Sequence, residues 1–285
     1  MIETKTLQGS SFAFPAKRVF VVLMAIICSL TLLNILSLLS TQLVIENYWL
    51  QEFRSSLIRL FDTNGEANIS SWYSSSALLA SSALLYAIVV FKSRAADDYQ
   101  RHWKLLAVIF LYLSLDEAAM GHEMLNKPVR AAFNTEGLLY YPWVLVAGVC
   151  LILLLFVYTR FLLHLPSNLR ILFISSGIIF VFGAIGVECL GAYIAWQDTT
   201  SGHAGMICTT TEEFLEMTGI ALFIYALMRY LNEHVLNPQT VTAKQLQCSV
   251  DSLLVDGTVE FKESGLTGGI DSKTQLPNSF SCVDR

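Results

Sequence analysis

Three apolar segments of this chain contain acidic residues, a residue type that is rare inside such runs. The acids, with one neighbouring histidine, are Asp116, Glu117, His122, Glu123, Glu188, Glu212, Glu213 and Glu216. Carboxylates accompanied by an imidazole are hard ligands, which suit Mg²⁺, Mn²⁺, Ca²⁺ or iron. A carboxylate left free beside such an ion could act as a general base on a metal-bound water. The residue types therefore predict a site for a divalent metal ion.

Helical geometry would place the acids of each segment on one face. At about 100° per residue, Asp116, Glu117 and Glu123 fall within about 120° of one another, with His122 at the edge. The three acids of 212–216 span about 100° of a second helix. We therefore expect both helices to turn their acids in one direction.

Four of the acids lie too deep in their apolar runs to be explained as hydrated residues or helix ends. They are Asp116, Glu117, Glu188 and Glu216. An acid at the middle of a membrane costs about 2.5–3.5 kcal/mol, and such residues mark function by default. We expect these four to be the catalytic residues and the core of the metal site, with His122 and Glu123 completing the coordination sphere.

Two further features bear on how close the helices come and on the remaining acids. Glu188 shares its expected helix face with Gly177 and other small residues, which would let a second helix approach. The sequence Thr210-Thr-Glu-Glu213 has the form of a capping box, in which acids of the first turn favour the helix dipole. This pattern predicts Glu212 and Glu213 to be helix-start residues rather than ligands.

The elements that must hold these residues are runs long enough to cross about 30 Å of hydrocarbon. Of the 285 residues, 54% are hydrophobic and 14% charged, against about 25% charged in a typical soluble domain. The six candidate runs are Phe20–Val44, Trp72–Phe91, Trp103–Leu125, Pro142–Leu163, Ile171–Trp196 and Phe214–Val235. We expect an all-α, polytopic integral membrane protein with a six-helix transmembrane domain over 19–236, preceded by segment 1–18 and followed by segment 237–285.

The polar and aromatic residues near the ends of these runs give an orientation. All five tryptophans lie at or near span ends, where the ring prefers the headgroup region. Lys and Arg gather in alternate loops, and 197–211 contains none. By the positive-inside rule both termini are cytoplasmic, in a plasma or inner membrane. The acids of three spans would then share one layer near the extracytoplasmic face.

Two segments outside the spans have patterns of their own. Leu50, Phe53, Leu57 and Leu60 recur at helical spacing in the first outer loop. This spacing predicts a short amphipathic helix that either lies on the outer membrane surface or covers the mouth of the bundle as a lid. Beyond Pro238 the chain is polar and lacks an apolar pattern, which predicts a disordered tail.

Composition and motifs leave three classes of function open. The net charge of −5 argues against nucleic acid, and six scattered cysteines form neither a disulfide framework nor a zinc motif. The chain has no nucleophile motif, phosphate loop or dinucleotide fingerprint. The first class is a metalloenzyme that acts on a lipid-like substrate from the bilayer. The second is a cation or proton-coupled transporter, and the third is a non-catalytic membrane assembly subunit. Whether the protein is an enzyme stays open.

Overall fold

The computed structural model describes residues 14–63, 68–93, 98–197 and 202–236, and all regular structure within these ranges is helical. The long helices are α1 (Ala16–Ser40), α3 (Ile69–Ser93), α4 (Gln100–Ala119), α6 (Trp143–His164), α7 (Ser167–Val181), α8 (Glu188–Trp196) and α9 (Gly202–Tyr230). A π-helical turn, η3 (Phe182–Val187), joins α7 to α8, and a second one, η4 (Leu231–Leu236), ends the described chain. Five helical stretches are long and apolar enough to cross a membrane, or six if one bent pair counts as a span.

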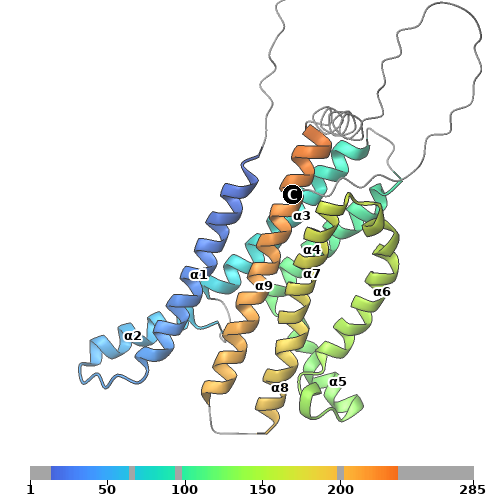
Figure 1. Ribbon diagram of the computed structural model, residues 1–285. Coiled ribbons are helices and arrows are strands. Elements are labelled where there is room, and N and C mark those ends of the chain that lie inside the picture. Colours follow the sequence, from blue (N-terminus) through green and yellow to red (C-terminus); the bar gives the residue numbers. More distant parts are fainter. Residues whose placement is uncertain (1–13, 64–67, 94–97, 198–201, 237–285) are drawn as a thin grey trace, which may run out of the picture.

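The outward surface of these helices is apolar, as a lipid-facing surface would be. On α6, for example, Phe156 is 78% exposed and its neighbours Ile152 and Leu153 are also exposed. The start of α1 and the end of α9 lie at the same end of the bundle (Figure 1). The predicted tail 237–285 and most of segment 1–18 lie outside the described residues.

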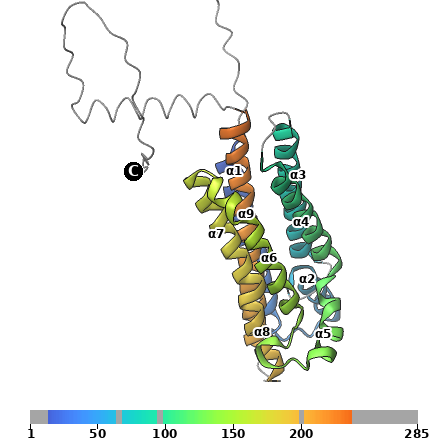
Figure 2. The same cartoon turned by 90° about the vertical axis from the view of Figure 1, so that its right-hand side faces the viewer.

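Helix α9 is the centre of the bundle. It packs against α1, α3, α7 and α8 along its length (Figures 1 and 2). Gly219 allows the closest of these approaches, because a Cβ there would lie 2.8 Å from the backbone nitrogen of Phe180 on α7. At the end of the bundle where α1 starts and α9 ends, Trp103 of α4 is 1% exposed and packs its ring against Phe161 and Tyr230.

The third predicted span does not run straight to Leu125. Helix α4 ends at Ala119, because Met120 adopts the left-handed conformation with φ of 51°. The chain then bends by 76° into η1 (His122–Leu125) and α5 (Asn126–Phe133). The N–H of Gly121 bonds back to the carbonyl of Asp116 at 3.3 Å, a bond that closes a helix end instead of continuing it. The prediction of one regular helix through 125 is therefore wrong.

The sixth span also differs from its prediction. Helix α9 begins at Gly202, so Glu212 lies about three turns inside it and not in a first turn. The hydroxyls of Thr210 and Thr211 donate to carbonyls one turn earlier, each at 2.7 Å. A threonine bonded in this way satisfies its hydroxyl inside a helix, so the polar run does not mark a helix end. The interpretation of Glu212 and Glu213 as capping residues is wrong.

The short helix of the first outer loop is present as α2 (Tyr48–Phe61), so the amphipathic pattern gave the right element. The Asn47 side chain caps it by accepting from the N–H groups of Trp49 and Leu50. Arg54 ties it to α1 by donating to the carbonyls of Ser40 and Leu43. No residue of α2 is buried, and the helix points away from α5 and α8 (Figure 1). It therefore does not cover the bundle as a lid.

Candidate functional site

Three helices carry their acids at the same level, in the half of the bundle away from the start of α1 and the end of α9. Glu188 is the first residue of α8, about two turns before the helix ends at Trp196. Glu212 lies ten residues after the start of α9, or about 15 Å along its axis. Glu117 lies two residues before the end of α4. We call the group Asp116, Glu117, Glu188, Glu212, Glu213 and Glu216 the carboxylate layer.

One contact in the layer joins two carboxyl groups directly. A side-chain hydrogen bond links Glu188 to Glu212. Because an ionised carboxylate only accepts hydrogen bonds, one of these two groups must carry a proton. The Oε1 atom of Glu188 also accepts from the indole Nε1 of Trp143 at 3.1 Å, so the first residue of α6 holds this glutamate in place.

The other two acids of α9 face α4. Glu213 interacts electrostatically with Glu117 and Glu188, and Glu216 interacts with Glu213 and with the same two residues. The Oε2 atom of Glu213 is buried and has no hydrogen-bond partner in the described part of the chain. It is thus an acceptor oxygen that the protein buries among other acids without satisfying it.

Asp116 and His122 form the opposite edge of the layer. His122 Nδ1 lies 2.8 Å from Asp116 Oδ2, and the two side chains are 28% and 13% exposed. In a straight helix residues six apart lie about 9 Å apart along the axis and point in different directions, so the bend at Met120 creates this pair. The imidazole also packs on Trp143, with ring centroids 4.6 Å apart. Gly121 matters as well, because a Cβ there would lie 2.8 Å from Asp116 Oδ1.

The predicted set of metal ligands is only partly brought together. Glu216 interacts electrostatically with Glu117 and with Glu188, and Asp116 interacts with Glu117. Glu123 lies beyond the bend and is exposed. Among the residues that the structure describes, no three His, Cys, Asp or Glu side chains are arranged to hold a metal ion. A preformed metal site of the six predicted residues is therefore not found.

The basic residues at this end of the bundle contact other groups. Arg130 donates to the carbonyl of Tyr140 and lies over its ring, with 3.9 Å between guanidinium carbon and ring centroid. Arg54 binds the carbonyls at the end of α1. In the described ranges no Lys or Arg forms an ion pair with the carboxylate layer. The negative charge of the layer must be removed by protons or by a bound cation.

The π-helical turn η3 lies directly against the acids of α9. A Cβ at Gly183 would lie 3.0 Å from the Glu212 carbonyl oxygen and 3.2 Å from Glu216 Cγ. Gly177, expected at this contact, is exposed instead, with no atom within 4 Å of its Cβ position. The wider turn changes the helix register between Gly177 and Glu188, so Gly177 does not lie at the contact, whereas Ala192, another small residue expected on that face, is fully buried. Single π-helical turns occur frequently at functional sites.

Tyr141 adds a hydroxyl close to the layer, from the loop before α6. Burial raises the pKa of this phenol above its ordinary value, and the nearby Glu188 raises the pKa further. The hydroxyl therefore stays protonated at neutral pH and is a hydrogen-bond donor.

Sequence reasoning missed three members of the site. Glu212 and Glu213 were set aside as capping residues, and Trp143 was interpreted only as an interfacial anchor. A signal for the first two was present, since 202–211 contains no proline and could continue a helix. No sequence pattern links Trp143 to Glu188, because the contact joins two helices 45 residues apart.

Comparison with known proteins gives a family but no activity. A family profile described as "Domain of unknown function (DUF8692)" matches residues 19–231, which is well over half of the chain. The chain belongs to the DUF8692 family. No curated protein and no solved structure matches it. The DUF8692 region contains every residue of the carboxylate layer, together with Trp143 and His122.

Proposed function

We propose that this DUF8692 protein is a six-span integral membrane protein whose carboxylate layer binds a divalent cation in the extracytoplasmic half of the bilayer. The six-span arrangement treats α4 with η1 and α5 as one bent span. The alternating basic loops support cytoplasmic termini, as does the position of the start of α1 and the end of α9 at one end of the bundle. The carboxylate layer then lies toward the outer side.

The observation that carries the cation proposal is the buried, unpartnered Oε2 atom of Glu213. Clustered acids with no basic partner repel one another and are costly to bury. A bound cation would both satisfy the Glu213 oxygen and cancel the repulsion among the acids. In the cation-free protein, protons reduce the negative charge of the layer instead, since a hydrogen bond between Glu188 and Glu212 needs a proton on one of the two carboxyl groups.

Because the acids do not form a ready metal cage, binding has to rearrange side chains. A Mg²⁺, Mn²⁺, Ca²⁺ or iron ion entering the layer would displace the proton shared by Glu188 and Glu212. Glu213 and Glu216 would turn toward Glu117, with which each of them interacts electrostatically. Oxygen ligands of this type suit these hard cations.

The metalloenzyme is the more specific form of this proposal. Glu117, Glu188, Glu213 and Glu216 would hold the ion, and the partly exposed Asp116–His122 pair would take a proton from a water that the ion polarises. The substrate would be lipid-like, because the layer lies at membrane depth and the outward surface around it is apolar.

Proton binding is the second candidate, and the hydrogen-bonded carboxyl pair favours it. A transporter also needs a path to the other side of the membrane. Beyond Glu216 the buried face of α9 continues with the apolar side chains of Met217, Ile220 and Ala221. The buried polar groups on the neighbouring α3, such as Ser81 and Ser82, are hydroxyls, so no further carboxylate continues the layer toward the other side. Proton storage or sensing therefore fits this observation better than transport does.

Titration with Mn²⁺, followed by electron paramagnetic resonance on purified protein, separates these functions. Glu213→Gln keeps the side-chain shape and removes the charge, so it should weaken Mn²⁺ binding about tenfold or more, since a contact to a charged group contributes about 1.5–3 kcal/mol. Glu136→Gln changes an exposed acid at the same end and should leave binding unchanged. Absence of Mn²⁺ binding in the wild type, with proton uptake on acidification, would favour the proton function. If the wild type shows neither Mn²⁺ binding nor proton uptake, the result would favour a non-catalytic assembly subunit.

A further inference from the structure

Two serine hydroxyls near the start of α3 are buried without a partner. Ser70 and Ser74 are 1% and 2% exposed, and neither Oγ atom has a hydrogen-bond partner in the described part of the chain. Another buried serine of the same helix is satisfied, because Ser81 donates to the carbonyl of Ala77 at 2.9 Å. Since buried hydroxyls nearly always have a partner, the two hydroxyls indicate a group that the protein binds there.

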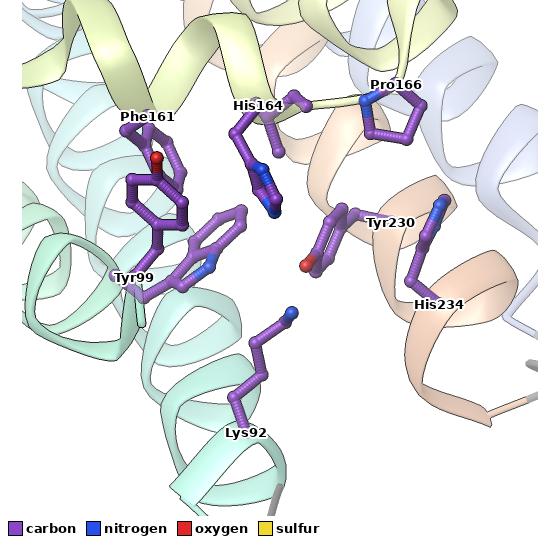
Figure 3. Close-up of a pocket in the computed structure, with 9 residues that line it drawn as sticks. Lys92, Tyr99, Phe161, His164, Pro166, Tyr230 and His234 are labelled. Carbon is purple, nitrogen blue, oxygen red and sulfur yellow. The ribbon is translucent and has the colours of Figure 1, made fainter. Parts of the chain in front are cut away.

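Helix α3 runs in the same direction as α9. Lys92, near the end of α3, lies over the ring of Tyr230, the last residue of α9, at 5.6 Å from its centroid. Both residues line a cavity of about 170 Å³ that also has two histidines, His164 and His234, in its wall (Figure 3). The first turns of α3 therefore lie toward the opposite end of the bundle, which holds the carboxylate layer.

Core packing gives the level of the two serines along α9. Ala77 of α3 and Ile220 of α9 belong to one hydrophobic cluster. Ser70 lies seven residues before Ala77, which is about 10 Å along the helix axis. Glu213 lies the same seven residues before Ile220. Ser70 is therefore level with Glu213, and Ser74 is about one turn further along α3.

The packing of α4 against α3 leads to the same level. The Ser75 hydroxyl donates to the carbonyl of Ser114 at 2.8 Å, and a second bond, seven residues further along α3, meets α4 seven residues earlier. The two helices are therefore antiparallel, and a step forward on one matches a step back on the other. Glu117, three residues after Ser114, is then level with position 72, midway between the two serines.

The two hydroxyls also lie on the side of α3 that is turned toward the acids. At about 100° per residue, Ser70 and Ser74 lie about 60° and 100° around the helix from Tyr73. Ser75 lies about 200° from Tyr73 in the same sense. Tyr73 packs against the core that α1 and α9 form, and Ser75 bonds to α4. The unpartnered hydroxyls thus lie between the directions of α9 and α4, the helices that carry most acids of the layer.

We propose that Ser70 and Ser74 are ligands of the cation that binds the carboxylate layer, and that they make the site select Ca²⁺ over Mg²⁺. The inference rests on the proposed cation binding. Hydroxyl oxygens add ligands without adding negative charge, so they enlarge the coordination sphere without increasing the repulsion among the acids. An ion at this level would satisfy the two serine oxygens and the unpartnered oxygen of Glu213 at once.

The chemistry of the two ions gives the expected preference. Ca²⁺ takes about 6–8 oxygen ligands in flexible geometry, whereas Mg²⁺ gives up its water reluctantly and usually keeps several water ligands. A buried site with oxygens from α3, α4, α8 and α9 requires the ion to exchange its water for protein oxygens. Ca²⁺ makes this exchange more readily than Mg²⁺.

The test is a competition experiment on the full-length protein in nanodiscs. Mn²⁺ is bound first and followed by electron paramagnetic resonance, and Ca²⁺ or Mg²⁺ is then added. Ca²⁺ should displace Mn²⁺ at a concentration about tenfold or more below that of Mg²⁺. Ser70→Ala and Ser74→Ala should each weaken Mn²⁺ binding about three- to tenfold and reduce the preference for Ca²⁺.

Two further variants complete the set. Ser74→Cys nearly keeps the side-chain volume but replaces a hard oxygen with sulfur, a poor ligand for Ca²⁺, so it should act like Ser74→Ala. Ser81→Ala is the matched control, because it removes a buried hydroxyl of the same helix that is already bonded to a carbonyl. It should change neither the Mn²⁺ affinity nor the ratio of Ca²⁺ to Mg²⁺ binding.

The results separate this inference from the proposed function. Unchanged affinity and ion preference in Ser70→Ala and Ser74→Ala would mean that the hydroxyls do not contact the ion, while cation binding itself would stand. A wild type that binds Mn²⁺ but does not prefer Ca²⁺, or an equal loss in Ser81→Ala, would also overturn the inference. A wild type that binds no cation would remove the proposed function as well. If an alanine variant fails to fold, Ser74→Cys and the ion preference of the wild type decide.

Discussion

Glu213 is a residue whose burial fold stability alone does not explain. Its buried Oε2 atom has no hydrogen-bond partner among the described residues, and it faces Glu117 and Glu188. An unsatisfied buried polar group costs about 1–3 kcal/mol. A protein that only had to fold would gain by replacing this side chain with an apolar one, so the acid is consistent with a binding role.

Because the buried Glu213 oxygen would lower stability but support cation binding, one substitution should have opposite effects on stability and on binding. Glu213→Met should raise the free energy of unfolding of the cation-free protein by about 1–3 kcal/mol, because the unsatisfied oxygen is removed. It should also remove any stabilisation by Mn²⁺. Thermal unfolding with and without Mn²⁺ measures both effects, and Glu136→Met at an exposed position is the control. A loss of stability in cation-free Glu213→Met would mean that the carboxyl is satisfied in the native protein.

At the scale of elements, close packing between the fifth and sixth spans holds the carboxylate layer together. Gly183 in η3 and Gly219 in α9 allow the two spans to touch at points on either side of Glu216. Gly183 lies on the α9 backbone at the acids, whereas Gly219 lies on the backbone of Phe180. The helices can therefore present Glu188 and Glu216 to each other only while both glycines lack a side chain.

A pair of glycine substitutions tests this packing. In Gly219→Ala the new Cβ would lie 2.8 Å from backbone atoms of Phe180, so α7 and α9 must separate. Overpacking of this kind costs about 1–3 kcal/mol. Gly177→Ala, in α7 at an exposed position with no atom within 4 Å, should be neutral or stabilise by up to about 1 kcal/mol. The thermal midpoints of both variants give the comparison. Similar midpoints would mean that the contact at Gly219 is loose.

For the whole molecule, the two ends of the bundle carry opposite chemistry. One end holds six acids with no basic partner in the described chain, and the other holds the cavity lined by Lys92 and two histidines. The start of α1 and the end of α9 lie at the basic end (Figure 1). In the proposed orientation, these two ends lie toward different membrane faces.

Topology mapping tests the orientation. Reporter fusions after Ser93 and Leu236 should be cytoplasmic, because the basic loops are retained on that side. Fusions after Asn64 and Gly202 should be exported. Activity of alkaline phosphatase and of a cytoplasmic reporter at each position provides the measurement. A cytoplasmic signal from the Gly202 fusion would move the carboxylate layer to the inner face and change the cation pool that it meets.

The sequence by itself determined the helical character of the chain, the approximate spans, the α2 helix and the level at which the acids of three spans lie. Hydropathy and helical periodicity are local properties, and one sequence suffices to read them. Even so, the predicted end of α4 and the predicted start of α9 were wrong. The left-handed conformation of Met120 and the hydrogen-bonded hydroxyls of 209–211 cannot be inferred from amino-acid composition.

Only the tertiary structure decided how the site is put together. The bend after Ala119 brings His122 back to Asp116, the π-helical turn exchanges Gly177 for Gly183 at the α9 contact, and Trp143 reaches Glu188 from another helix. It likewise placed Glu212 and Glu213 inside α9 instead of at a helix start, and it left Glu123 outside the carboxylate layer. Each of these contacts joins residues whose separation depends on how whole helices pack, and no local sequence pattern encodes that distance.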